Sequence, residues 1–280
     1  MTGCGRGKVP EGPECRRIAE DLAKVVSGKK ITNIEILSGR YVKKEISGLS
    51  RFRDCLPIGI AGAGVHGKFI YLICEKEYSI WNTLGMSGSW KTEESNYSRI
   101  RLDLSDRTSV YFDDMRNFGT IKIVAGKHQL IEKLQSLGPD MLNSDIDHPE
   151  FIRRLRKKNS SNICKVLMDQ CVISGVGNYL KADSLWDAKI YPFANVADLS
   201  DSELSDLCDS IKKVISASYE STDTAIQTYS AGEYEKGNYS SRFLVYNMKT
   251  DQMGNEVVKS MTPDGRKTHW SEKVQVRGKK

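Results

Sequence analysis

The chain has 280 residues with 39% hydrophobic and 28% charged content, which is typical of a folded globular protein and long enough for two domains. No apolar run approaches the length of a membrane span, and the N-terminus lacks the apolar core of a signal peptide. Lys and Arg outnumber Asp and Glu, 42 to 36, and the net charge of +6 is a mild bias toward anionic partners.

The first part of the chain predicts one helix followed by short strands. Residues 1–9 are small, polar and basic, and predict a disordered tail. A helix is expected over residues 12–26, because Ile18, Leu22 and Val25 fall on one face. Strands are expected where apolar residues alternate or run together, at 31–36, 69–73, 100–104 and 120–124. Short strands at this spacing, with polar turns between them, favour a β-sandwich or barrel.

The second part predicts helices and then returns to strands. The helical signals are a cap at Asp147 before a basic run, a helix at 162–170, a glycine-rich turn at 174–177, a helix from Asn178 that ends before Pro192, and a capping box of Ser200 and Glu203. After residue 240, strands at 243–246 and 256–258 are expected, with turns at Gly254 and at 263–266. These strands predict a small hairpin with little core of its own.

The segment from Val9 to Glu14 has two interpretations. In the first, proline suits the first turn of a helix and acidic residues suit the positive end of its dipole. In the second, Pro10 is the first residue of the mature chain, so its nitrogen is a secondary amine that attacks a sugar C1′ and forms an iminium. Glu11 and Glu14 would then donate or accept protons beside it. The rest of the sequence decides between the two.

Residues in the strand-rich part also carry two interpretations. Lys68 opens an apolar strand and is either a solvated lysine or a phosphate contact. Met86 either fills core or is exposed, and Arg116 and Phe118 lie in what is either an ordinary turn or a DNA-contacting loop. Exposed together, these three side chains would wedge into a base stack, as proteins that extrude bases require.

Two residues of the second part suit phosphate binding. Asn178 follows a glycine-rich turn at a helix N-terminus, where free backbone N–H groups bind anions. Arg266 lies at a hairpin turn. For either residue alone, an ordinary turn with a solvated side chain is the more common explanation.

Taken together, the motifs resemble the formamidopyrimidine-DNA glycosylase and endonuclease VIII (Fpg/Nei) family over residues 10–275. The motifs that occur in the family's order are Pro-Glu-Gly-Pro-Glu at 10–14, His-Gly-Lys at 66–68, Leu-Gly-Met-Ser-Gly at 84–88, Arg-Asn-Phe-Gly at 116–119, Leu-Gly-Pro-Asp at 137–140 and the segment 167–192. Gly12, and the Gly-Asn-Tyr-Leu run at 177–180, are similar to the endonuclease VIII branch and its vertebrate members.

The resemblance implies an α+β fold. It consists of an N-terminal β-sandwich with an N-terminal helix in a domain of residues 1–136, and a helix-two-turn-helix domain of residues 137–280. The second domain ends in a zincless-finger hairpin at about 240–280. The implied catalytic residues are Pro10 as nucleophile, Glu11 as acid, Glu14 as supporting acid and Lys68. The implied DNA contacts are Met86, Arg116 and Phe118 in the gap left by the extruded nucleotide, and Asn178 and Arg266 on phosphates.

The sequence departs from the family's pattern at both ends. The family usually ends in a four-cysteine zinc finger, but no cysteine follows Cys208, and Ser271 and Val274 stand where the last pair is expected. We therefore predict no metal and no cofactor. Nine residues precede Pro10, and an amide-bonded proline has no nucleophilic nitrogen. The start is then at Val9 (a non-AUG codon), or the tail is cleaved, or catalysis is impaired.

The predicted function is base excision repair by a bifunctional DNA glycosylase/AP lyase that excises oxidised bases, mainly pyrimidines and hydantoins. Its partner would be double-stranded DNA with oxidised bases or abasic sites, bound by a monomer that contacts no membrane. Seven cysteines, an odd number without CxxC spacing, favour an intracellular location wherever the DNA is: nucleus, cytoplasm or viral factory. The alternatives are a DNA-binding protein of this fold without lyase activity and an Fpg-like 8-oxoguanine glycosylase, a choice on which the loop at 220–237 bears.

Overall fold

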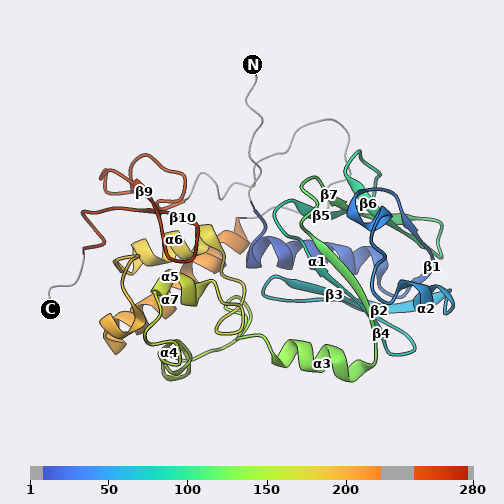
Figure 1. Cartoon of the computed structure of the whole chain (residues 1–280), viewed down its shortest axis with the longest axis horizontal. Helices are drawn as coiled ribbons and strands as arrows, with labels where there is room; N and C mark the ends of the chain where they lie inside the picture. Colours follow the sequence, from blue (N-terminus) through green and yellow to red (C-terminus); the bar gives the residue numbers. More distant parts are fainter. Residues whose placement is uncertain (1–8, 222–242, 277–280) are drawn as a thin grey trace, which may run out of the picture. The chain divides into compact units, whose positions relative to one another are not determined.

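A computed structural model describes residues 9–221 and 243–276, which form two compact units (Figure 1). Residues 9–10 and 14–136 form the first, here called the sheet unit. Residues 11–13, 137–221 and 243–276 form the second, here called the helical unit. Most of the loop predicted to bear on base preference, residues 222–237, lies outside the described residues.

The sheet unit is built on eight antiparallel strands in the order β5-β7-β6-β1-β2-β3-β4-β8. The strands are β1 (Lys30–Ile36), β2 (Ile58–His66), β3 (Phe69–Cys74), β4 (Tyr78–Thr83), β5 (Gly88–Lys91), β6 (Ser98–Leu104), β7 (Ser109–Asp114) and β8 (Thr120–Ala125). The beginning of β2 pairs with β1 and the rest of it pairs with β3, so β2 joins the two halves of the sandwich. All four strands predicted from alternating or apolar runs are present.

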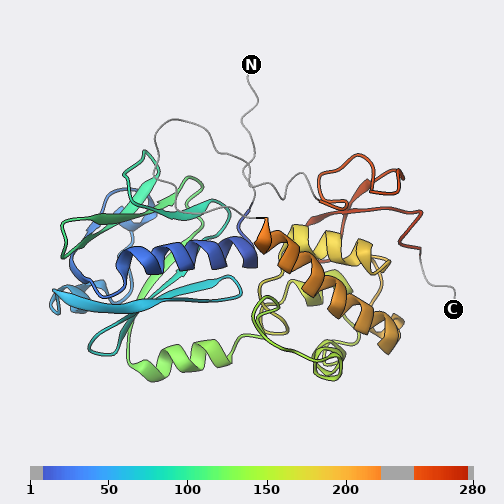
Figure 2. The same ribbon diagram turned by 180° about the vertical axis from the view of Figure 1, so that it is seen from behind.

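One helix packs along the sheet and completes the core of this unit (Figure 2). It is α1 (Gly12–Val26), with the bounds that the apolar periodicity predicts. Ile18, Leu22 and Val26 are buried, whereas Val25, predicted for this face, is only partly buried. The alternation in β6 also matches its burial, with every second side chain in the core. Shorter helices follow: η1 (Gly39–Val42), α2 (Leu49–Arg53) and α3 (Lys127–Gln135).

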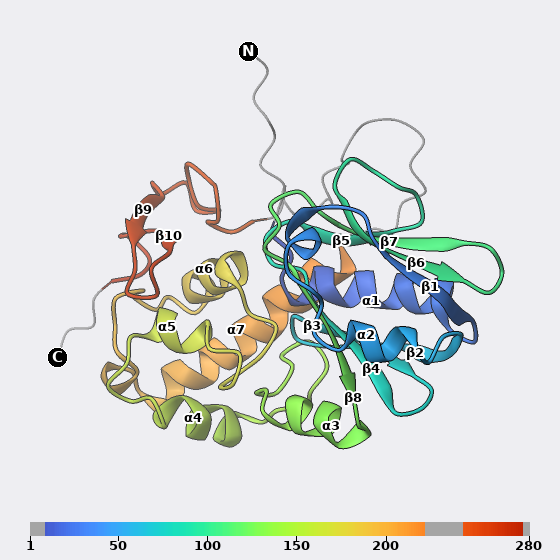
Figure 3. The ribbon, with the colours of Figure 1, turned by 45° about the vertical axis from the view of Figure 1, so that its right-hand side comes forward.

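The helical unit contains several helices and a small hairpin (Figure 3). Its elements are α4 (His148–Arg156), α5 (Ile163–Leu167), α6 (Asn178–Asp187), η2 (Val196–Asp198), α7 (Asp201–Glu220), β9 (Val258–Met261) and β10 (Lys267–Trp270). The Asp147 side chain accepts from Glu150 N at the start of α4, and Ser200 and Glu203 form the capping box of α7. Because these caps depend on neighbouring residues, the sequence predicts them well.

The strand predicted at 243–246 is wrong, and the strand predicted at 256–258 is displaced, because β9 begins at Val258. The only hairpin among the described residues of this unit pairs β9 with β10, around the predicted turn at 263–266. The backbone N–H groups of Val245 and Tyr246 donate to the Asp183 carboxylate at 3.0 and 2.9 Å, so they are not free for a strand ladder. Near Gly254 the pairing is limited to a single bridge between Thr250 and Glu256.

The predicted α+β class is confirmed, with an N-terminal β-sandwich and a separate helical unit that ends in a hairpin. None of the helices in the described residues has both the length and the apolar character needed to cross a bilayer.

Candidate DNA-repair active site

Glu11, predicted as an acid catalyst, is buried and caps a helix that is distant from it in sequence. Its Oε1 accepts from Tyr179 N at 2.9 Å and its Oε2 from Leu180 N at 3.2 Å. These N–H groups belong to the first turn of α6, where no intrahelical acceptor exists and the helix dipole favours negative charge. Gly177, the N-cap residue of α6, has no side chain for this task. Glu11 therefore takes the place of a local capping residue and is held there as a carboxylate acceptor.

Small residues allow this approach of residues 11–12 to the turn before α6. A Cβ placed on Gly177 would overlap the Glu11 carboxylate, and one on Gly12 would lie 3.0 Å from the Cα and O of Gly175. The Gly12 N–H also donates to Gly175 O at 2.9 Å. Gly12 and Gly177 thus have a packing reason that is independent of any motif, and Gly175 has a φ of +96°, which favours glycine.

The helical unit brings Asn178 to the hairpin that carries Arg266. Asn178 is the first residue of α6, and its Nδ2 donates to the carbonyl oxygen of Lys267 at 3.1 Å. Arg266 precedes Lys267 and its side chain is exposed. Glu11, Asn178 and the Arg266 segment, predicted from separate motifs, are therefore neighbours around the N-terminus of α6.

A buried ion pair that the sequence analysis did not predict connects this hairpin to α6. Lys181 Nζ lies 2.6 Å from Asp264 Oδ2, and the two side chains are 0% and 2% exposed. Thr262 Oγ1 donates to Asp264 Oδ1 at 2.6 Å and contacts Thr268 Oγ1 at 2.7 Å. Burial opposes ionisation of Asp264, but the hydrogen bonds from Lys181 and Thr262 outweigh it, so its pKa lies below the ordinary value. Asp264 is the residue two before Arg266, so this network fixes the turn that presents Arg266.

The sheet unit contains the other predicted site residues. Pro10 and Glu14 are half-buried, and Glu14 lies in the first turn of α1. Lys68 lies in the two-residue turn between β2 and β3, where His66 pairs with Phe69. The position of Lys68 at the start of an apolar strand is the one predicted from the sequence.

The three predicted wedge residues are exposed on two adjacent loops of the sheet unit. Met86 and Phe118 are 37% and 55% exposed, and Arg116 is also exposed. The guanidinium carbon of Arg116 lies 5.2 Å from the centre of the Phe118 ring. Met86 lies between β4 and β5, and the other two lie between β7 and β8. The core interpretation of Met86 is therefore wrong, whereas a role in DNA contact stays a prediction.

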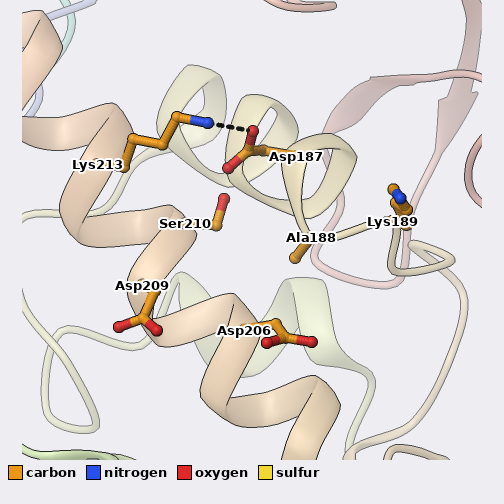
Figure 4. A pocket seen from close by; sticks show the side chains of 7 residues that line it. All are labelled: Asp187, Ala188, Lys189, Asp206, Asp209, Ser210 and Lys213. Carbon is orange, nitrogen blue, oxygen red and sulfur yellow. Dashed lines mark hydrogen bonds and ion pairs between the residues drawn. The ribbon is translucent and has the colours of Figure 1, made fainter.

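A surface hollow of the helical unit does not coincide with these residues (Figure 4). It has a volume of about 410 Å³, and it is lined by Asp187, Ala188, Lys189, Asp206, Asp209, Ser210 and Lys213. Lys213 Nζ points toward Asp187 Oδ1 at 2.7 Å. The lining contains three carboxylates and only two amines, so its negative charge does not suit the binding of a phosphate.

The hairpin does not fit a zinc ion. No group of three or more His, Cys, Asp or Glu side chains within residues 9–221 and 243–276 has the arrangement of a metal site. Where the resemblance places the last cysteine pair, Ser271 N donates to Gln275 Oε1 at 3.0 Å, and Gln275 Nε2 donates to Ile190 O at 2.8 Å. This segment is closed by hydrogen bonds, which is consistent with a zincless finger.

Comparison with known proteins shows which protein family this chain is related to. The family models described as Formamidopyrimidine-DNA glycosylase N-terminal domain and Formamidopyrimidine-DNA glycosylase H2TH domain match residues 9–121 and 137–230, together well over half of the chain. A formamidopyrimidine-DNA glycosylase of Wolbachia pipientis is 28% identical over 272 residues, which cover 94% of this chain and 98% of that protein. The one from Zymomonas mobilis is 26% identical, with 87% and 91% covered.

Solved structures agree with these matches. A variant of the Lactococcus lactis enzyme in complex with Fapy-dG-containing DNA is 26% identical with a TM-score of 0.82, and covers 96% of this chain and 100% of that chain. The Thermus thermophilus enzyme, 24% identical with a TM-score of 0.80 and the same coverage, shares the fold. The chain therefore belongs to the formamidopyrimidine-DNA glycosylase/endonuclease VIII family.

Proposed function

We propose that the protein is a bifunctional DNA glycosylase/AP lyase of base excision repair. Family membership supports DNA glycosylase activity on damaged bases. The observation that carries the finer proposal is the fixed Glu11 carboxylate, which is bonded to the N-terminus of α6 and is covalently adjacent to Pro10. A rigid acid–base group next to the proposed nucleophile is what covalent catalysis requires.

The chemistry suits a terminal proline better than a lysine. A terminal amine has a pKa of about 7.7–8.0, against about 10.4 for lysine, so roughly a tenth or more of it is unprotonated at neutral pH. Attack of this nitrogen on C1′ breaks the bond to the damaged base, and the attacking nitrogen gives up its proton. Cleavage of the C1′–O4′ bond, with a proton supplied to O4′, then opens the sugar ring and forms the iminium. The iminium acidifies the C2′ proton, and its removal expels the 3′ phosphate and nicks the strand. Glu11 and Glu14 are proposed to move the protons in these steps.

Extrusion of the damaged nucleotide precedes this chemistry. It costs a few kcal/mol, and less for a damaged or mismatched base. We propose that Met86, Arg116 and Phe118 occupy the resulting gap, and that Asn178 and Arg266 bind the phosphates. Exposed aromatic, thioether and guanidinium groups are suited to contact unstacked bases.

The proposed substrates are oxidised pyrimidines and hydantoins, with purines as the alternative. The names of the related enzymes indicate formamidopyrimidines, which favours the alternative. A structure of the Lactococcus lactis enzyme holds DNA with an oxidised pyrimidine. Gly12, one reason for the endonuclease VIII-like assignment, also has the packing explanation given above, so it discriminates weakly between the two branches.

A trapping experiment tests the proposal. In the 280-residue chain the Pro10 nitrogen is in an amide bond with Val9. A form that begins Met-Pro10, processed to expose the proline, should cleave duplex containing an oxidised base, and borohydride should trap it covalently on DNA. Side-by-side duplexes with an oxidised pyrimidine and with 8-oxoguanine then separate the two substrate classes.

The intact 280-residue form is the control, because its Pro10 nitrogen is an amide and is not nucleophilic. It should bind DNA and trap poorly, in which case the alternative of a DNA-binding protein without lyase activity describes that form. If it is verified intact by mass and traps as well as the short form, another amine is the nucleophile. Lys68 is then the first candidate.

A further inference from the structure

A single buried carboxylate connects the two loops that carry the exposed wedge residues. Asp114, the last residue of β7, is 1% exposed. Its Oδ1 accepts from Ser87 Oγ at 2.5 Å and its Oδ2 accepts from Gly119 N at 2.6 Å. Ser87 follows Met86, and Gly119 follows Phe118, so each oxygen holds one loop at the residue next to a wedge side chain.

The serine extends this connection to the third wedge residue. Ser87 Oγ, which donates to Asp114, also accepts from Arg116 N at 2.8 Å. One hydroxyl thus joins the Met86 loop to both the carboxylate and the backbone of Arg116. The network consists of Asp114, Ser87, and the N–H groups of Arg116 and Gly119.

The backbones of the two loops are in close contact. A Cβ on Gly85 would lie 2.7 Å from Phe118 C and Gly119 N, and Gly85 has a φ of +63°. Asn117, between the other two wedge residues, has a φ of +60°. A residue other than glycine or asparagine rarely adopts this backbone conformation. The loops therefore have a defined shape that requires both the glycine and the buried carboxylate.

We infer that Asp114 is a positioning residue that assembles Met86, Arg116 and Phe118 into one wedge before DNA binds. The inference rests on the proposed function of these three residues and goes beyond it. Because both oxygens of Asp114 are used, loss of this side chain releases both loops at once. The two loops would then have to become ordered during base extrusion, and their loss of conformational entropy would oppose that step.

The neighbouring residue provides a matched control. Asp113 is on the same strand, is 3% exposed, and accepts from Ser98 Oγ at 2.6 Å and from Ser95 Oγ. It also pairs with Lys91 Nζ at 2.8 Å. None of these partners is adjacent to a wedge residue. In both pairs, Ser87–Asp114 and Ser98–Asp113, a serine hydroxyl donates to a buried aspartate. The two pairs differ in the loops that they hold in place.

The test compares Ser87→Ala and Asp114→Ala with Ser98→Ala and Asp113→Ala in the full 280-residue chain. The first readout is the fluorescence of 2-aminopurine placed beside a stable abasic analogue in duplex DNA, which rises when a base is unstacked. Ser87→Ala and Asp114→Ala should weaken this rise while DNA is saturated with protein, and the two control variants should retain it. Asp114→Asn, which keeps an acceptor for Gly119 N, should recover most of it.

The second readout uses the same substitutions in the form with an exposed Pro10. Ser87→Ala removes two hydrogen bonds and should slow base removal by at least about tenfold, the effect of losing one of them, with much less effect on cleavage of a preformed abasic site. Equal losses in Ser87→Ala and Ser98→Ala, or no loss in Ser87→Ala, would overturn the inference. If Asp114→Ala does not fold, the serine variants decide.

The two proposals fail in distinguishable ways. If the wild-type protein removes no base but the fluorescence differences hold, the proposed chemistry is wrong and the positioning role stands. If base removal occurs and the four variants behave alike, the chemistry stands and the role of Asp114 is wrong. If wild-type binding causes no unstacking, the wedge itself is disproved, and the positioning role with it.

Discussion

The buried ion pair between Lys181 and Asp264 gives the sharpest prediction about stability. The perturbation is Lys181→Met, which keeps most of the side-chain volume and removes the charge. Both side chains are essentially without solvent exposure, and Nζ and Oδ2 are 2.6 Å apart. Removal of one partner from a buried pair leaves an uncompensated charge and typically costs about 3–5 kcal/mol. Thr262 still donates to Asp264, so we expect the lower end, about 3 kcal/mol.

A surface pair with the same N–O distance is the control for this prediction. Arg153 Nε and Glu150 Oε2 are also 2.6 Å apart, but the side chains are 55% and 34% exposed. In water the attraction is screened and the side chains lose entropy on pairing. Arg153→Met should therefore leave the free energy of unfolding nearly unchanged. The two pairs thus have the same N–O distance and differ strongly in burial, and the surface pair also joins residues one turn apart in α4.

The assay is urea unfolding at neutral pH combined with hydrogen exchange of β9 and β10. Exchange in the hairpin should accelerate in Lys181→Met more than exchange in the sheet unit, because the pair holds the hairpin turn. The double variant Lys181→Met/Asp264→Asn should cost less than the sum of the singles, since it leaves no unpaired charge. Additive costs, or a cost below about 1 kcal/mol in Lys181→Met, would refute the argument.

The remaining predictions concern the same hairpin. Strong chelators should not change strand nicking and elemental analysis should find no stoichiometric zinc, because the described hairpin offers no cysteine; one zinc per chain would contradict this. Arg266→Ala should weaken binding to damaged and undamaged duplex alike and reduce the salt slope by about one, whereas a change in lesion preference would show that Arg266 contacts bases. The pKa of His269 is lowered to about 4 by its burial and then by the charges of Lys259 and Lys181. From pH 7 to 5 the unfolded chain gains a proton there that the folded chain does not, so stability should fall by about 2 kcal/mol through this residue. His269→Phe should remove that part of the pH dependence of urea unfolding, and an unchanged dependence would contradict the assignment.

The sequence predicts those parts of the fold that depend on neighbouring residues. The bounds of α1 and the strand β6 follow from the period of apolar residues, and the caps at Asp147 and Ser200 follow from residues three positions apart. The residues at 243–246 have the apolar character of a strand. A carboxylate from α6, Asp183, takes their backbone N–H groups instead, and no local pattern contains that information.

For the candidate site too, the sequence predicts what short motifs contain and misses what depends on contacts between distant residues. Its residues were identified because short motifs occur in the family's order, and their roles remain predictions. The contacts that hold these residues in place were not predicted, because each contact joins residues that are distant in sequence. Glu11 caps a helix that begins at Asn178, and Lys181 pairs with Asp264. The lysine did leave a signal, since Lys181 and Asp183 are charged residues among the apolar and small residues of α6. A charged residue in such a segment requires a buried partner.

A hairpin held by an ion pair and hydrogen bonds is sensitive to other conditions than a hairpin held by zinc. Zinc held by thiolates is lost to chelators and to oxidation of its ligands, because the ligands must stay deprotonated and reduced. Here the turn before Arg266 is held by the Lys181–Asp264 pair, and the end of the hairpin is closed by Ser271 and Gln275. None of these groups is redox-active, but the ion pair is stable only while both partners are charged. Because the pKa of Asp264 is lowered in the folded state, its contribution is complete above the ordinary carboxylate pKa and is lost as the pH falls through the folded value. The presentation of Arg266 should therefore be insensitive to oxidants and chelators and should weaken in acid, where His269 also acts against the folded hairpin.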